Sequence, residues 1–203
     1  MVNPKSSGVS LKFSKRQLVV CIFLIVLLSL LTLFYVFQIP IREYFFKSKY
    51  LEIMNNLNSP DRKAIIRGNL TSSYNFTGLF IWEHSYVKWV PMNQTFPRSS
   101  DPVEILTNGK GRCGEFSILY VSACLSLGYE ARLLAAVRPD YSELHNFAEV
   151  KLNNSWIHVD PTDQEWNQSS MYASWWGQIG KDAQIFAFEV GKCENVTSRY
   201  IGT

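Results

Sequence analysis

The chain has few residues suited to binding a metal. Its 203 residues include four cysteines, none in a C-x-x-C pair, and only three histidines. Structural zinc sites usually draw on such pairs, so no metal is expected, and nothing in the sequence calls for a cofactor. Cys21 lies in an apolar run. Cys124 and Cys193 are either one disulfide or two buried reduced thiols, and Cys113 is then a free thiol.

The folded part of the chain has little net charge. The formal charge is +3, but four basic residues precede residue 18 with no acidic residue among them. The remainder is therefore nearly neutral. Nucleic-acid binding needs a basic face. No nucleic-acid partner is expected.

Charge is entirely missing from residues 18–39, which read LVVCIFLIVLLSLLTLFYVFQI. Such a run can cross a hydrocarbon core of about 30 Å as a helix. A cleaved signal peptide is the alternative, but its apolar core is usually about 7–15 residues and ends at small residues. No A-x-A-like site follows here. The sequence predicts a short N-terminal segment over 1–17 and a transmembrane helix over 18–39.

Two patterns predict the orientation of this helix. The basic residues before it outweigh those after it, where Glu43 and Glu52 intervene, which favours a cytoplasmic N-terminus. All N-x-[ST] sequons follow the helix: Asn69, Asn75, Asn93, Asn153, Asn167 and Asn195. We therefore expect a single-pass membrane glycoprotein whose catalytic domain lies outside the cytoplasm.

The segment after the apolar run divides into a juxtamembrane part over 40–79 and a domain over 80–203. In the first, apolar residues recur at helical spacing between Ile41 and Leu57, as in a juxtamembrane helix or stalk. At the start of the second, residues 80–90 are typical of a helix that Pro91 ends. Three prolines then indicate a loop over 91–102.

Residues 113–127 predict a helix buried on all sides, with Gly128 at its stop. Cys113 is its first residue. Gly111 and Gly114 leave room for close backbone approach, and the unpaired amides of a helix N-terminus favour a thiolate there.

Strand patterns follow this helix. Residues 129–137, 145–152, 155–160 and 183–190 have the length and composition of strands, with a hairpin turn at 153–154. We expect an antiparallel sheet packed on the cysteine helix. Alternation puts His145 and Asp160 on the sheet face opposite the apolar sets that face the core.

Three side chains could act together as a nucleophile, a base and an orienting acid. The hairpin places the start of 145–152 beside the end of 155–160, so Asp160 can accept from His145 while its other ring nitrogen faces Cys113. His158 is the rival base, but it lies on the same strand as Asp160 and points alongside it. His84 is expected at the surface or in packing. A buried structural cysteine remains the alternative.

These motifs resemble the transglutaminase-like superfamily, and within it the core of peptide:N-glycanase. The resemblance rests on GRCGE at 111–115, HNFAEV at 145–150, WIHVD at 156–160 and VTSRY at 196–200, in that order. It covers about residues 80–203. It implies an α+β fold of the papain-like, transglutaminase-like type, with helices packed on an antiparallel sheet.

The resemblance also implies roles for individual residues. Cys113 is similar to the family's nucleophile, His145 to its base and Asp160 to its orienting acid. The substrate-binding candidates are Arg132, Trp156, Asp163 and Glu115. Candidates for a ring N–H at the oxyanion hole are Trp82 and Trp89, which are otherwise core aromatics.

The chain departs from the family in three respects. It lacks the zinc-binding C-x-x-C pairs before FPR at 96–98, it has Phe147 where tryptophan is usual, and it is expected to be anchored in a membrane. The predicted function is a membrane-anchored thiol amidohydrolase, peptide:N-glycanase-like, acting on a glycoprotein or peptide. A cysteine peptidase or protein acyl transferase and a catalytically silent binding or surface-structure domain are the alternatives.

Overall fold

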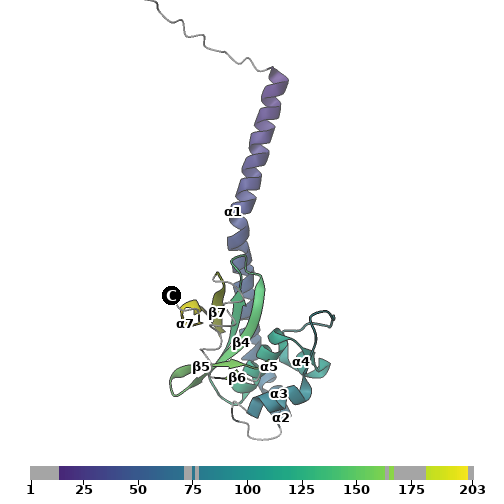
Figure 1. Ribbon diagram of the computed structural model, residues 1–203, viewed down its shortest axis with the longest axis vertical. Coiled ribbons are helices and arrows are strands. Elements are labelled where there is room, and N and C mark those ends of the chain that lie inside the picture. Colours follow the sequence, from purple (N-terminus) through teal and green to yellow (C-terminus); the bar gives the residue numbers. More distant parts are fainter. Residues whose placement is uncertain (1–13, 71–74, 76–77, 163–164, 167–181, 201–203) are drawn as a thin grey trace, which may run out of the picture. The chain divides into compact units, whose positions relative to one another are not determined.

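The computed structural model describes residues 14–70, 75, 78–162, 165–166 and 182–200 (Figure 1). The chain divides into two compact units, Met1–Ile41 and Arg42–Thr203. Asp163 and residues 167–181, with the sequon at Asn167, lie outside the described residues.

Helix α1 spans Lys15–Leu57 and contains the apolar run. Within that run, the hydroxyls of Ser29 and Thr32 donate to the carbonyls of Ile25 and Leu28, so their polar groups are satisfied inside the helix. In the described residues this is the one helix long and apolar enough to span a membrane, and a signal sequence would pass the same test.

The second unit already begins at Arg42. The boundary expected at residue 80 therefore does not appear in the structure. Side chains of α1 that were expected in a juxtamembrane helix or stalk are buried in the main core, namely Phe46, Tyr50, Ile53, Met54 and Leu57. They are buried because the apolar positions of this helical stretch share one side that packs on the rest of the unit.

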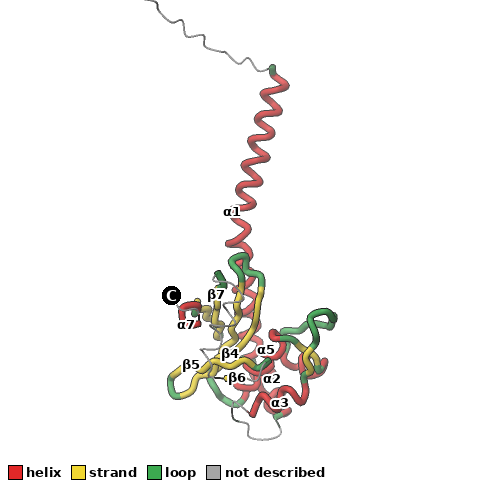
Figure 2. Tube along the Cα trace, in the orientation of Figure 1, coloured by secondary structure: helices red, strands yellow, loops and turns green. Residues whose placement is uncertain are grey.

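Three short helices precede the cysteine helix: α2 (Pro60–Asn69), α3 (Gly78–Tyr86) and α4 (Pro102–Asn108). Ser59 and Asp101 cap α2 and α4, and Arg62 ties the two caps together through Asp101 at 2.6 Å. All three helices contact α5 (Cys113–Ser126), which is buried over most of its length. Figure 2 shows these helices grouped beside the strands. Gly128, with a φ of 87°, follows the end of α5 as predicted.

The predicted helix over 80–90 is too long. It ends at Tyr86, and the next residues form strand β1 (Lys88–Trp89), which pairs in parallel with β2 (Lys110–Gly111). The amide of Val90 donates to the carbonyl of Gly111 at 2.9 Å. Pairing with β2 thus satisfies backbone groups that a helix running into Pro91 would leave without partners.

The main sheet is antiparallel, in the order β6-β5-β4-β3-β7-β8. Its strands are β3 (Ala131–Val137), β4 (Glu143–Leu152), β5 (Ser155–Asp160), β6 (Glu165–Trp166), β7 (Gln184–Glu189) and β8 (Lys192–Asn195). The β4–β5 hairpin turns at Asn153 and Asn154, whose φ angles are 50° and 65°. Positive φ at both positions is the type I′ geometry that fits a right-handed strand twist. The α+β class and the antiparallel sheet on the cysteine helix are confirmed.

One expectation about the sheet is wrong. The face that carries His145 and Phe147 is not outside the core but holds a second, smaller core. Its buried members come from three strands, from the C-terminal helix α7 (Thr197–Tyr200), and from the residues just before β7 and α7: Leu134, Ala136, Phe147, Ala183, Ile185, Ala187, Val196 and Tyr200. The apolar runs of β3 and β7 put such residues on both faces, which a single strand's alternation does not reveal.

Candidate active site

Cys113 is the first residue of α5, half-buried, and the cap of this helix is built by Glu115. One Glu115 carboxylate oxygen accepts the backbone N–H of Arg112 at 3.0 Å, and the other accepts from Arg98. Glu115 is only 2% exposed. The structure therefore places this substrate-binding candidate in the helix cap, where it fixes the turn that carries the thiol.

The two glycines beside Cys113 have different surroundings. A Cβ on Gly111 would lie 2.7 Å from the Glu115 Cβ, so this glycine makes room for the helix cap. A Cβ on Gly114 would lie 3.1 Å from an Arg98 nitrogen and 3.4 Å from the Asn146 side-chain oxygen. Gly114 is thus the glycine that keeps the space beside the thiol clear.

His145 and Asp160 meet across the β4–β5 hairpin, on one face of the sheet. His145 Nε2 lies 2.6 Å from Asp160 Oδ2, and both residues are buried. The other carboxylate oxygen accepts the backbone N–H of Thr162 at 3.0 Å, which fixes its orientation. Cys113 lies close enough to the His145 ring to raise its pKa. Since Nε2 faces Asp160, Nδ1 is the ring nitrogen left for the thiol.

The surroundings of His145 favour its protonated form. Burial acts to lower its pKa, but the hydrogen bonds to Asp160 and Cys113 and the charges of both groups act in the other direction. Together they raise the pKa of His145 to about 10. An imidazolium between a thiol and a carboxylate can stabilise a thiolate and later give its proton to a leaving group.

The rival base His158 lies in a different environment. Burial lowers its pKa to about 4, against the opposing charge of Asp160 and with a further lowering by His145. Its Nδ1 lies 3.4 Å from the Tyr200 hydroxyl, and its ring packs on Phe147 at 4.9 Å. His158 is thus a neutral packing residue of the second core. The third histidine, His84, bonds the Pro161 carbonyl at 2.9 Å and packs on Phe116.

The two oxyanion candidates differ in what their ring N–H can reach. Trp82 is 2% exposed and donates its Nε1–H to the carbonyl of Asn69 at 3.2 Å. Trp89 is 46% exposed and pairs with Gly111 in the β1–β2 ladder, two residues before Cys113. Of the two, Trp89 is the one whose place next to the cysteine loop suits an oxyanion donor.

Arg132 and Trp156 lie together but toward the other end of β4. Arg132 is 1% exposed, bonds Glu149 at 2.5 Å, and its guanidinium lies 4.0 Å from the Trp156 ring centroid. Glu149 is four residues beyond His145, about 13 Å along the strand. The structure therefore separates this pair from Cys113. The fourth substrate-binding candidate, Asp163, lies outside the described residues.

Two polar residues beside the thiol have no signal in the sequence analysis. Asn146, which follows His145, donates its Nδ2–H to the Tyr50 hydroxyl at 2.7 Å. Tyr50 belongs to α1 and is 3% exposed, and burial is the main cause that raises its pKa well above 10. Only the packing of α1 on the sheet brings this tyrosine to the site, and spacing along the chain cannot show it.

A buried acid lies behind the site. Glu83 of α3 is 0% exposed, and within the described residues neither carboxyl oxygen has a hydrogen-bond partner. Burial, and next the charge of Asp160, raise the pKa of Glu83 well above its usual value. The surroundings of Glu83 therefore favour its protonated form, and Asp160 is the carboxylate that contacts His145.

Within the described part of the chain, the other cysteines of the folded unit are unpaired and the side chains offer no metal site. Cys124 and Cys193 are both free thiols, but only Cys124 is buried, and Cys193 is half-buried. Burial raises the pKa of both. No group of three or more His, Cys, Asp or Glu side chains in the described residues could hold a metal ion.

Comparisons with known proteins agree on the fold. The model of the transglutaminase-like superfamily matches residues 63–161. The peptide-N(4)-(N-acetyl-beta-glucosaminyl)asparagine amidase of Yarrowia lipolytica is 30% identical over 108 residues, 52% of this chain and 28% of that protein. That of Oryza sativa subsp. japonica is 35% identical over 85 residues, 41% of this chain and 18% of that protein.

Among solved structures, Rad4-Rad23 crosslinked to an undamaged DNA is similar with a TM-score of 0.57 at 12% identity. The match covers 81% of this chain and 48% of that one. At this identity the likeness concerns the fold alone. The chain spans less than a third of the two amidases it matches.

Proposed function

Because the chain contains a transglutaminase-like domain that resembles peptide:N-glycanase, we propose that it is a thiol amidohydrolase. The observation that carries this proposal is the contact between His145 Nε2 and Asp160 Oδ2 at 2.6 Å, with Cys113 close enough to the same ring to raise its pKa. A nucleophile, a base and an orienting acid in this relation are what hydrolysis of an amide requires.

The proposed reaction has two steps. The Cys113 thiolate attacks the amide carbonyl, and the His145 imidazolium gives its proton to the departing nitrogen. The nitrogen leaves as an amine, and a thioester remains on Cys113. The now neutral His145 takes a proton from water, whose oxygen attacks the thioester. The C–S bond breaks, the acid departs, and the thiolate and imidazolium are restored. Asp160 stays charged throughout and stabilises the imidazolium.

The proposed substrate is an N-glycosylated asparagine in a protein or peptide. The support is the similarity to the two amidases, whose name describes action on this linkage. Cleavage would leave aspartate and a glycosylamine. Arg132, Trp156 and Asp163 remain proposed contacts to the glycan. Arg132 bonds Glu149, which lies about 13 Å along β4 from His145, so this pair would meet sugars beyond the bond cleaved.

We also propose that residues 18–39 anchor the enzyme in a membrane, with residues 1–17 in the cytoplasm and the catalytic unit on the other side. Helix α1 has the length and composition for this. The basic residues before the run and the sequons after it support the orientation.

Glycopeptide hydrolysis in heavy-oxygen water tests the reaction. The full chain, in detergent, is incubated with an N-glycopeptide in H₂¹⁸O. The expected result is one ¹⁸O in the side chain of the former asparagine, together with the released glycan. The Cys113→Ser and His145→Ala variants are expected to release no glycan. Backbone cleavage or amine crosslinks in place of the label would make the protein a peptidase or acyl transferase.

Thiol labelling tests the silent-domain alternative. Cys113 paired with an imidazolium is expected to react with iodoacetamide at pH 6 at least tenfold faster than an ordinary thiol, for which the thiolate forms near pH 8.5. His145→Ala is expected to remove this advantage. Equal, slow rates in both proteins would show that the arrangement serves structure alone.

A further inference from the structure

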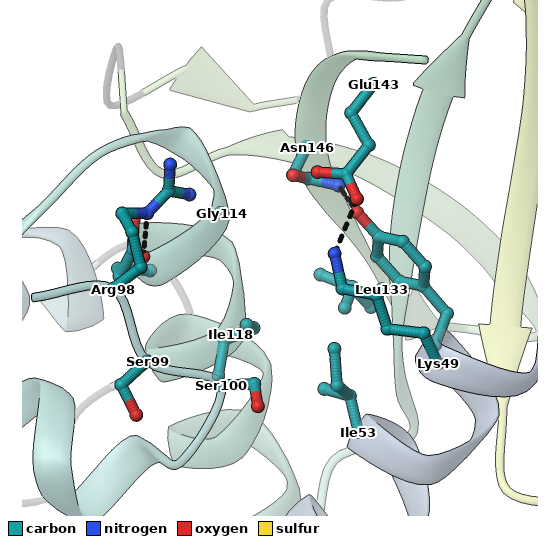
Figure 3. A pocket seen from close by; sticks show the side chains of 12 residues that line it. Lys49, Ile53, Arg98, Ser99, Ser100, Gly114, Ile118, Leu133, Glu143 and Asn146 are labelled. Atoms are coloured by element: carbon teal, nitrogen blue, oxygen red, sulfur yellow. Dashed lines mark hydrogen bonds and ion pairs between the residues drawn. The ribbon is translucent and has the colours of Figure 1, made fainter. Parts of the chain in front are cut away.

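A pocket of about 390 Å³ lies next to the cysteine, between the cysteine helix and α1 (Figure 3). Gly114 and Asn146, the neighbours of Cys113 and His145 in the chain, both line it. Arg98 and Tyr50 also line it, and the charge of Cys113 is among the causes that raise the pKa of each. A substrate whose amide reaches Cys113 therefore has its adjoining atoms at the mouth of this pocket.

The deeper lining of the pocket is aliphatic. Ile53, Ile118 and Leu133 contribute to it, and each is at most 6% exposed. The aromatic residue among the described lining residues, Tyr50, stacks its ring on Phe188 at 4.8 Å and is 3% exposed. A sugar binds best against an open aromatic face, which Tyr50 does not offer here. Aliphatic side chains favour an apolar group.

The charges around the pocket cancel in pairs. Lys49 bonds Glu143 at 2.6 Å on one side, and Arg98 bonds Glu115 on the other. Figure 3 shows Arg98 on one side of the space and the Lys49–Glu143 pair on the other, with Ser99 and Ser100 on the Arg98 side. A charged occupant would have to break one of these pairs. An uncharged occupant leaves both in place.

One wall of the pocket is formed by residues outside the region that matches the family model. Lys49, Tyr50 and Ile53 come from α1, before residue 63, where the match to the family model begins. The shape and polarity of the pocket are therefore set by the segment that joins the apolar run to the rest of the domain.

We propose that this pocket binds an apolar side chain of an extended polypeptide, next to the residue whose amide is attacked. This inference rests on the proposed function for its connection to catalysis. The volume lies within the range of about 300–1,000 Å³ typical of small-ligand sites.

Selectivity toward reactive peptides is the test. Pentapeptide chloroacetamides that differ at one position, with leucine, phenylalanine, aspartate or lysine, are reacted with the full chain in detergent, and labelling of Cys113 is followed by mass spectrometry. The leucine and phenylalanine peptides are expected to react at least tenfold faster than the charged ones. Iodoacetamide, too small to use the pocket, sets the reference rate.

Two variants probe the pocket itself. Ser100 is exposed and lines it, so Ser100→Trp fills the space without altering the core and is expected to bring the four rates within threefold. Ser198→Trp, at an exposed position of α7, is the matched control and is expected to keep the selectivity. Glu143→Lys leaves three positive charges around the pocket and is expected to shift the preference to aspartate.

Binding separates this inference from the proposed function. Fluorescent amides of the same peptides are titrated into Cys113→Ala, where no reaction occurs. Apolar preference that Ser100→Trp removes supports the pocket even if wild-type Cys113 proves an ordinary thiol, in which case only the catalytic proposal falls. Equal binding of all four peptides, a preference for lysine or aspartate, or a selectivity that survives Ser100→Trp would overturn the inference.

Discussion

His145 and His158 show how local partners decide the state of two equally buried histidines. Both lie near Asp160, and burial acts to lower the pKa of each. His145 bonds the carboxylate directly at 2.6 Å, and its pKa rises to about 10. For His158, burial outweighs the opposing effect of the Asp160 charge, and the pKa falls to about 4. A direct bond to the carboxylate therefore selects the charged histidine.

Asp160→Asn tests this dependence on the carboxylate. The amide oxygen of asparagine can still accept from Nε2, but it carries no charge to stabilise the imidazolium. We expect kcat/KM for glycopeptide hydrolysis to fall about 10⁴-fold, as for the loss of an orienting acid in other triads. Asp140→Asn, which alters an exposed carboxylate paired with Arg42, is the control and is expected to stay within twofold. A comparable small loss in Asp160→Asn would remove Asp160 from the mechanism.

The two histidines also predict opposite effects of pH on stability. In the folded state the pKa of His145 is raised from its ordinary value of 6.5 to about 10. Its contribution to stability is therefore present below pH 6.5 and is lost as the pH rises toward 10. His158 stays neutral in the fold below 6.5, so its stabilising effect is lost as the pH falls from 6.5 to 4.

Urea unfolding of residues 42–203 measures both effects. The free energy of unfolding of the wild type minus that of His145→Gln is expected to shrink by about 1 kcal/mol or more between pH 7 and 10. For His158→Gln the corresponding difference is expected to shrink between pH 6.5 and 4. Constant differences across both windows would show that these histidines titrate alike in the folded and unfolded chains.

At the level of elements, the cap of α5 links the fold to the thiol. Glu115 holds the Arg112 amide and Arg98, and the missing side chain of Gly111 makes room for it. Gly111→Ala would put a Cβ 2.7 Å from the Glu115 Cβ and 3.1 Å from Val87. Because the Glu115 Cβ is fixed to the helix backbone and the Val87 side chain is short, neither can move away easily. We therefore expect a loss of about 1–3 kcal/mol in unfolding free energy.

Gly68→Ala is the matched control, since a Cβ there meets open space on α2. It is expected to stabilise the protein by about 0.5–1 kcal/mol through the helix preference of alanine. Urea midpoints of both variants decide the matter. A Gly111→Ala protein as stable as the wild type would mean that the cap shifts freely, and its thiol reactivity should then be measured.

The sequence predicts those elements whose evidence is local. Strands β3, β4, β5 and β7, the Asn153–Asn154 turn and helix α5 all follow from periodicity and turn chemistry. The short strands β1, β2 and β8 were missed because their pairing partners, and not their own residues, create them. The same holds for the site: His145 and Asp160 share a hairpin, whereas Tyr50 and Glu83 reach it only through tertiary packing.

At the scale of the whole molecule, the apolar run and the catalytic unit share one helix. α1 runs from Lys15 to Leu57, and its residues after Arg42 belong to the catalytic unit. Tyr50 contacts Asn146, and Lys49 and Ile53 line the pocket. The helix that would anchor the protein therefore also supplies part of the proposed substrate site. A truncation that begins the chain after residue 57 would remove the apolar run together with Lys49, Tyr50 and Ile53.

Occupancy of the sequons tests the proposed orientation. Asn93 and Asn153 are exposed, in a loop and a hairpin turn, whereas Asn69 is half-buried and donates its Nδ2–H to the Ile65 carbonyl at 2.8 Å. If the catalytic unit enters the secretory lumen, Asn93 and Asn153 are expected to carry glycans and Asn69 to remain bare, because its nitrogen is already bonded inside α2.

Expression in a eukaryotic cell that glycosylates exported proteins, followed by endoglycosidase treatment and electrophoresis, gives the readout. Asn93→Gln and Asn153→Gln are each expected to remove one glycan step, and Asn69→Gln none. An N-terminal epitope tag should be digested by protease added to intact microsomes, while the catalytic unit is protected. A membrane-integrated protein with no glycan and a protected tag would reverse the topology and place Cys113 in the cytoplasm, where its thiol would need no protection from oxidation.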